Sequence, residues 1–252
     1  IDLGFNTWKA MTGQYLWTGA NLSLTDDAFG TSTTYDTFGR TTSKTVNVDG
    51  NLNAVLYAGV GLPMFGRKLT LKPGINSSFI RYTNLIEDQE NVTDNFAMSG
   101  NLDIDFQFDS LEINVTNRLS YNNPTSSLSS VSNSPYTTTM LGVGFKWTLP
   151  RGFVISSDGE YTKNKQEGAG FYNLEYFILN AEVSKSFLKT NNLVIALVGK
   201  DLLNQNINAA RQVNGNVITD NRTSIISRYF LLRATLRFNN RKTKEEDFHG
   251  MH

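Results

Sequence analysis

The chain has 252 residues and no cysteine, and its 23 basic and 23 acidic side chains give a net charge of zero. This balance argues against a nucleic-acid partner, which needs a basic face, and the lack of cysteine excludes disulfides and thiolate metal sites. The longest purely apolar run, 193–199, is far shorter than the roughly 20 residues of a membrane-spanning helix. A helical membrane protein is therefore excluded, and abundant Gly, Asn, Ser and Thr favour an all-β chain.

The first strands are predicted from apolar residues that alternate with polar ones, because successive side chains of a strand point to opposite faces. Residues 1–6 form the end of a strand already under way, and a second strand runs to about Thr25. The polar stretch 26–42 is expected to be a loop. One continuous strand is predicted over 46–62 (VNVDGNLNAVLYAGVGL), where only Gly50 interrupts the apolar row.

The middle of the chain repeats this alternation on both sides of short turns. Pro73 lies inside a predicted strand and cannot donate to a ladder, so a bulge is expected there. Long polar loops are expected at 84–94, 122–136, 162–171 and 204–225. The clearest apolar rows are Phe96, Met98, Leu102, Ile104, Phe106 and Phe108; Leu111, Ile113, Val115, Leu119 and Tyr121; and Leu141, Val143, Phe145, Trp147 and Leu149.

The last strand, Arg228–Phe238 (RYFLLRATLRF), has the pattern of a transmembrane barrel strand. Every second residue is apolar, and the opposite row carries Arg233 and Arg237. The apolar row spans 230–238, about the length that crosses the hydrocarbon layer when a strand is tilted. Lipid on one side and a wet lumen on the other would explain both rows.

Connection lengths and aromatic residues favour an outer-membrane barrel over a soluble all-β domain. Short turns alternate with long loops, as periplasmic turns and extracellular loops do in such barrels. Aromatic girdles are expected at both ends, where rings sit at headgroup level. The members at the short-turn end are Phe65, Phe108, Trp147, Phe153, Phe187 and Phe238. Those at the long-loop end are Phe79, Tyr82, Phe96, Tyr121, Tyr136, Tyr161, Tyr172, Tyr176 and Tyr229.

The predicted fold class is therefore an all-β, transmembrane antiparallel β-barrel, with about ten strands and an initial stub. Because the last strand ends on the short-turn side, the C-terminus is expected to be periplasmic, and alternating strand directions make the stub run inward from outside. Bacterial single-chain barrels have an even number of strands. Residues 1–238 are thus expected to be the C-terminal part of a larger barrel, followed by a polar, disordered tail, 239–252.

Three segments carry a resemblance to a known family: 46–62, the sequence KDLLN at 200–204, and RYFLLRATLRFN at 228–239. They look like the C-terminal portion of the TonB-dependent-receptor-like outer membrane barrels of Bacteroidota. The resemblance implies an N-terminal plug before a barrel of about 22 strands, and uptake of a bulky nutrient. It also implies outer membrane lipid, a TonB-type energy-coupling protein and a surface lipoprotein as partners. The charged tail departs from barrels that end on their terminal aromatic.

No catalytic constellation, metal site or cofactor site stands out, so the chain is not expected to be an enzyme. His249 and His252 are the only histidines, and both lie in the tail. Asp201 and Asn204 are expected to cap a strand end. Two alternatives to transport remain: a structural, assembly or secretion-associated barrel component without transport of its own, and a barrel hydrolase. The hydrolase is disfavoured because no strand carries a histidine.

The candidate site is the row of polar side chains expected to face the lumen. Its carboxylates could suggest an acid–base pair, but they are expected instead to offset nearby cations in a solvated interior. Leu56 and Leu236 are expected to face lipid, and Asn51 to face the lumen. The residues expected to face the lumen are Asp103, Asp105, Glu112, Arg118, Asp158, Glu160, Arg233 and Arg237, with Glu182 and Lys146 in the same rows.

Overall fold

The computed structural model describes residues 1–128, 134–166, 173–188, 192–206, 209–214, 217–222 and 227–238, with backbone alone for 209–214 and 217–222. These residues form fifteen strands and one short 3-10 helix, η1 (Pro150–Gly152). The strands are β1 (Asp2–Trp8), β2 (Tyr15–Thr25), β3 (Ala28–Tyr35), β4 (Thr41–Val48), β5 (Asn51–Met64), β6 (Leu69–Ile86), β7 (Gln89–Gln107), β8 (Leu111–Ser126), β9 (Tyr136–Leu149), β10 (Phe153–Gln166), β11 (Leu174–Phe187), β12 (Leu193–Lys200), β13 (Ala209–Asn214), β14 (Val217–Arg222) and β15 (Tyr229–Leu236). In the described part of the chain, no helix has the length and apolar character to span a membrane.

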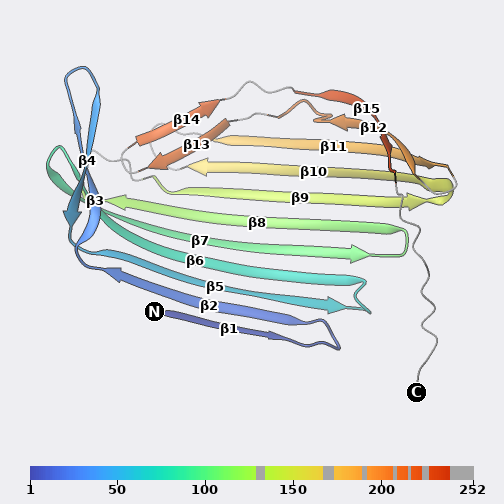
Figure 1. The fold of residues 1–252 in the computed structure, drawn as a ribbon, viewed down its shortest axis with the longest axis horizontal. Coiled ribbons are helices and arrows are strands. Elements are labelled where there is room, and N and C mark those ends of the chain that lie inside the picture. The colour runs from blue at the N-terminus through green and yellow to red at the C-terminus, as the bar shows by residue number, and fades with distance from the viewer. Residues whose placement is uncertain are drawn as a thin grey trace.

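Eleven strands follow one another in a single sheet, in the order β1-β2-β5-β6-β7-β8-β9-β10-β11-β12-β15 (Figure 1). Each neighbouring pair along this path is antiparallel. β3 and β4 form a hairpin off the path, joined to β6 by a short parallel bridge, and bring the sheet to 13 strands. The predicted ten strands and stub correspond to the eleven-strand path. The all-β antiparallel fold class is confirmed.

Cross-strand pairing collects the apolar rows of these strands on one surface, here called the apolar face. Directly opposed residues of an antiparallel pair point to the same side of the sheet. One line of paired residues is Leu71, Ile104, Val115, Val143, Gly159 and Leu179. A second line is Phe106, Ile113, Phe145, Ser157, Ala181, Gly199 and Phe230.

Large side chains of the apolar face are exposed rather than packed against a second sheet. Leu56 is 61% exposed, and Leu197 and Leu232 are also open. A soluble sandwich would bury such a row in a dry core. The opposite surface, here called the polar face, holds the alternating polar rows.

The stretch 46–62 is two strands, so the prediction of one continuous strand is wrong. β4 ends at Val48 and β5 begins at Asn51. Gly50 lies between them with φ +57°, a left-handed conformation that glycine adopts without a steric penalty. The expected loop 26–42 is also wrong, because β3 and the start of β4 occupy it. The apolar–polar alternation continues across the turn in the sequence because Val48, the last residue of β4, is apolar. Its side chain is buried at the base of the β3–β4 hairpin.

No bulge forms at Pro73, contrary to the prediction. The pairs Gly59–Gly74 and Leu62–Leu71 keep one register between β5 and β6, so no residue is inserted. Pairing lapses between them, opposite Pro73, while Pro73 stays paired with Leu102 of β7. The missing N–H is accommodated by a gap in one ladder.

Several expected loops are continuations of strands. β6 and β7 meet at a two-residue turn, Glu87–Asp88, with φ +51° and +59°, so 84–94 is not a loop. β10 continues to Gln166, and β13 and β14 form a hairpin within 204–225. Polar side chains do not stop a ladder, whose backbone bonds are independent of side-chain polarity. The long-loop end of the sheet therefore differs from the short-turn end in having strands that extend into the segments expected to be loops.

The register also corrects the aromatic girdle at the long-loop end. Tyr82, Tyr136, Tyr176 and Tyr229 pair with residues of the polar face. Phe79, Phe96, Tyr121 and Tyr161 lie on the apolar face. Tyr172, the tail 239–252 and both histidines lie outside the described residues.

Candidate functional site

The structure brings the predicted site residues to the polar face. Three lines of paired residues cross its centre: Asn101, Arg118, Met140 and Thr162; Asp103, Thr116, Gly142 and Glu160; and Asp105, Asn114, Gly144 and Asp158. Glu112 pairs with Lys146, and Arg233 lies opposite Ala196 on the same surface. Arg237 lies just beyond β15, where its amide donates to the Asn192 carbonyl at 2.8 Å.

Ion pairs join cations and carboxylates of different strands on this face. Lys146 Nζ lies 3.0 Å from Glu112 Oε1, and Lys72 Nζ lies 2.6 Å from Asp105 Oδ2. Arg233 of β15 reaches Glu182 Oε1 of β11 at 2.6 Å. That pair crosses β12 diagonally, because the β12 residue paired with Arg233 is Ala196 and the one paired with Glu182 is Val198. All these pairs are partly solvated, so each contributes little stability, and together they keep the face hydrophilic.

A hollow of about 270 Å³ lies on the polar face, over β9. Gly142 and Gly144 have no side chains to fill it. Arg118 of β8 and Glu160 of β10 line opposite walls, and neither makes a side-chain hydrogen bond or ion pair among the described residues. Asp158 accepts one hydrogen bond from Asn180 Nδ2, at 2.6 Å. The hollow is a surface of mixed charge, with Arg118 on one wall and Asp158 and Glu160 on the other.

The described residues do not assemble a metal-binding cluster of His, Asp and Glu. Asp103 Oδ1 and Thr162 Oγ1 are buried and without a hydrogen-bond partner in this part of the chain. No histidine lies within the described strands, so a hydroxyl nucleophile there has no imidazole base. The chemistry that this face supports is hydrogen bonding and ion pairing.

The 200–204 segment caps the end of β12, as expected for Asp201 and Asn204. Asp201 is only 3% exposed, and its two carboxylate oxygens accept from the amides of Gln205 and Asn206, at 2.9 and 3.1 Å. Asn204 Oδ1 accepts from the Arg228 amide at 3.3 Å, next to the start of β15. Both residues have positive φ and fold the chain back toward the sheet.

Asp201→Asn is expected to destabilise this cap by about 1 kcal/mol, because an amide NH2 group replaces one acceptor of a backbone N–H. The measurement is the free energy of unfolding in lipid vesicles. Glu160→Gln is the matched control, because Glu160 is exposed on the polar face and its carboxylate makes no hydrogen bond or ion pair within the described part of the chain. Equal losses in the two variants would mean that the Asp201 carboxylate has no special capping role.

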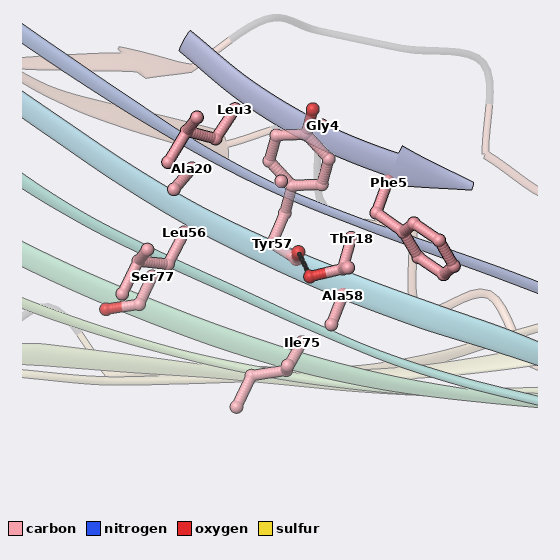
Figure 2. Close-up of a pocket in the computed structure, with 11 residues that line it drawn as sticks. Leu3, Gly4, Phe5, Thr18, Ala20, Leu56, Tyr57, Ala58, Ile75 and Ser77 are labelled. Atoms are coloured by element: carbon pink, nitrogen blue, oxygen red, sulfur yellow. Dashed lines mark hydrogen bonds between the residues drawn. The ribbon is translucent and has the colours of Figure 1, made fainter. Parts of the chain in front are cut away.

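An apolar groove of about 540 Å³ crosses β1, β2, β5 and β6 (Figure 2). The large side chains of Leu3, Phe5 and Leu56 line the groove together with the small residues Ala20 and Ala58. The small residues leave the space between the large side chains open. The Thr18 hydroxyl donates to the Tyr57 carbonyl at 3.0 Å, so its polar group is satisfied within the sheet. This groove belongs to the apolar face; Tyr57 contributes its backbone, because its side chain points to the polar face and covers Gly19.

The β3–β4 hairpin projects past the end of the sheet in Figure 1. Glu87 anchors it, since its amide donates to the Thr33 carbonyl at 2.9 Å and its carboxylate accepts from the Tyr35 amide at 2.6 Å. At the tip, Asp36 accepts hydrogen bonds from the backbone amide and from the guanidinium of Arg40. These bonds, the backbone one having the larger effect, hold the pKa of the Asp36 carboxyl below its ordinary value. The tip is therefore a charged, ordered turn.

Sequence reasoning missed two residues of the polar face. Lys72 forms an ion pair with Asp105. Asn180 donates to Asp158 through its Nδ2 and accepts from the Asp201 amide through its Oδ1, at 3.0 Å. Alternation could have found both, because each lies opposite an apolar row that was recognised. The contact between Asn180 and Asp201 could not be found this way, because it depends on how the chain folds back after β12.

Comparison with known proteins gives one family. The model of the outer membrane protein beta-barrel family matches residues 2–238, nearly the whole chain. Neither the curated proteins nor the solved structures include a match.

Proposed function

Because the chain belongs to the outer membrane protein β-barrel family, and so to the outer membrane of a Gram-negative bacterium, we propose that it forms the C-terminal part of a TonB-dependent-receptor-like transporter of the Bacteroidota kind. The transporter takes up a bulky nutrient. Its apolar face meets lipid and its polar face lines the lumen. Members of the family are typically not enzymes, and we assign no catalytic step to this chain.

The observation that carries this proposal is the direction of the two outermost strands of the path. Ten antiparallel pairings separate β1 from β15, so the two strands run the same way. If β1 and β15 met edge to edge they would pair in parallel, whereas outer-membrane barrels are antiparallel. Antiparallel closure requires an odd number of further strands, which fits a barrel larger than this sheet.

The polar face supports a wide, wet interior. Its ion pairs connect neighbouring or next-neighbouring strands and leave Arg118 and Glu160 available within the described chain. The largest outer-membrane transporters of this architecture have a plugged lumen, and a plug would meet such a surface. β15 ends at the same end of the sheet as the short turns, which supports a periplasmic C-terminus. A TonB-type protein and a surface lipoprotein are the proposed partners.

The test is growth of a strain that lacks the whole gene, on a panel of bulky nutrients and on their small building blocks. Transport requires loss of growth on at least one bulky nutrient, with growth on its building blocks retained and with dependence on the proton gradient. Normal growth on the whole panel, combined with detergent sensitivity of the outer membrane, would contradict transport and favour the structural or assembly role.

A further inference from the structure

Asn117 interrupts the apolar row of β8. Its cross-strand neighbours are Leu102 of β7 and Leu141 of β9, which places it on the apolar face. Val115 and Leu119 lie before and after it in the same row. Asn117 therefore puts a primary amide near the middle of a surface that otherwise meets hydrocarbon.

The Asn117 amide makes no side-chain hydrogen bond with any described residue, in contrast to two hydroxyl groups of this face. The Thr18 hydroxyl donates to the Tyr57 carbonyl at 3.0 Å, and the Ser157 hydroxyl donates to the Asn180 carbonyl at 2.7 Å. Both therefore satisfy their donor within the sheet. Hydrocarbon offers no replacement for water, so an unsatisfied amide there is costly, and polar residues inside a membrane usually have a partner.

A recess and a projection lie beside Asn117. Gly100 pairs with Leu119, and a Cβ at Gly100 would find its nearest atom, the Gly74 carbonyl oxygen, at 3.9 Å. The space above Gly100 is thus open. Leu119 next to it is 51% exposed. An isologous contact needs both features on one surface, because each copy supplies the projection and the recess.

We propose that the apolar face around Asn117, on β7, β8 and β9, is the contact surface between two copies of this chain in the membrane. Two copies inserted in the same direction are related by a two-fold axis along the membrane normal. The Asn117 amide both donates and accepts, so the same residue of the second copy satisfies it. Small residues and side-chain amides hold transmembrane helices together, and Gly100 and Asn117 offer the same two features on a strand surface.

The chemistry of the surface selects a second copy over lipid. An acyl chain has neither a donor nor an acceptor for the amide. The cross-strand neighbours Leu102 and Leu141 carry no charge, so a charged partner would lose water without gaining an ion pair. This contact depends on the apolar face meeting lipid and is independent of whether the protein transports a nutrient.

The direct test is cysteine cross-linking of the full-length protein in its own outer membrane, with a mild oxidant. Asn117→Cys is expected to give a disulfide-linked species of twice the monomer mass. Leu56→Cys is the matched control on the same face, away from β8, and is expected to remain monomeric. The unsubstituted full-length protein is treated in the same way, to show any dimer that forms through a native cysteine. No dimer from Asn117→Cys, equal dimers from both variants, or a cross-link to a protein of different mass would overturn the proposal.

A second variant separates association from folding. Asn117→Leu restores the apolar row, so the barrel is expected to fold while the dimer dissociation constant rises at least about tenfold, or about 1.4 kcal/mol. Ser77→Leu, a polar-to-apolar change on the same face, is expected to leave association unchanged. Sedimentation in detergent measures the oligomer, and the heat-dependent gel shift measures folding. A folded Asn117→Leu protein with unchanged association would overturn the proposal.

Discussion

Replacing Leu56 by arginine is expected to destabilise the membrane-inserted protein by about 2–4 kcal/mol, the cost of Arg at a lipid-facing site near the bilayer midplane. Leu56 lies on the apolar face of β5, opposite Ala20 of β2 and Ser77 of β6. With 61% of its surface exposed, it has no layer of described residues over it. An arginine there loses water and finds no carboxylate beside it. Folding into lipid vesicles, followed by the heat-dependent gel shift, measures the loss.

The matched control is Asn76→Arg. Asn76 pairs with Tyr57, the residue after Leu56, and lies at the same height on the polar face. An arginine there stays hydrated and is expected to change stability far less. Asn51 is also on the polar face, but its Oδ1 accepts from the Thr83 amide at 3.4 Å, so replacing it also removes a hydrogen bond. Equal damage at Leu56 and Asn76 would contradict the assignment of the faces.

Gly59→Ala is expected to destabilise the sheet by about 1–3 kcal/mol through overpacking. The Trp17 indole of β2 lies directly over Gly59 of β5, and a Cβ would fall 2.4 Å from its Cζ2. The same arrangement recurs nearby, with Tyr15 over Gly61 and Tyr57 over Gly19. These rings fill the space left by glycine on the neighbouring strand and so tie β2 to β5. Denaturant unfolding in vesicles measures the loss.

Two further variants isolate the contact of the ring with Gly59. Gly142→Ala on the same face is expected to be tolerated, because its Cβ would meet nothing closer than 3.8 Å. In a Trp17→Ala background the cost of Gly59→Ala is expected to disappear, because the clash has been removed, as a double-mutant cycle can show. A Gly59→Ala penalty that survives Trp17→Ala would have to come from the backbone.

Much of the sheet could be predicted because period-two alternation is a direct consequence of the pleat. Leu102, Ile104 and Phe106 of β7 were recognised by their spacing alone, and pairing puts them beside Ile113 and Val115 of β8 as alternation requires. The fold class and the strand path follow from such rows. Alternation cannot distinguish one strand from two that meet at a turn, which is why the sequence predicts a single strand through Gly50.

Strand ends were the least predictable part of the fold. The polar sequence between Asn84 and Asp94 predicts a loop, yet β6 and β7 run through it to the Glu87–Asp88 turn. Beyond the hydrocarbon layer a ladder needs no apolar row. Two consecutive acidic residues with positive φ were not recognised as a tight turn. At Pro73 the prediction was wrong for a different reason. The missing N–H of proline predicts a bulge, but the sheet keeps its register and only the pairing of β6 with β5 lapses there.

The candidate site was predictable as a surface and unpredictable as a set of contacts. Alternation placed Asp103, Asp105 and Glu160 in polar rows, and pairing brings those rows together. The reach of Arg233 over β12 to Glu182 is diagonal, since Arg233 pairs with Ala196 of β12 and Glu182 pairs with Val198, two residues further along. The hollow at Gly142 and Gly144 likewise requires the lateral register of three strands. One strand read alone contains no such information.

The central claim is that one face of the sheet meets lipid and the other meets water, and spin labels along β11 test it most directly. Single labels would be placed at Leu179, Ala181 and Val183 of the apolar face and at Glu182 and Ser184 of the polar face. In the full-length protein in vesicles, we expect lipid-soluble oxygen to relax the first set and not the second, with a period of two. Oxygen accessibility that is uniform along β11, or higher at Glu182 and Ser184, would contradict a membrane-spanning barrel with these faces.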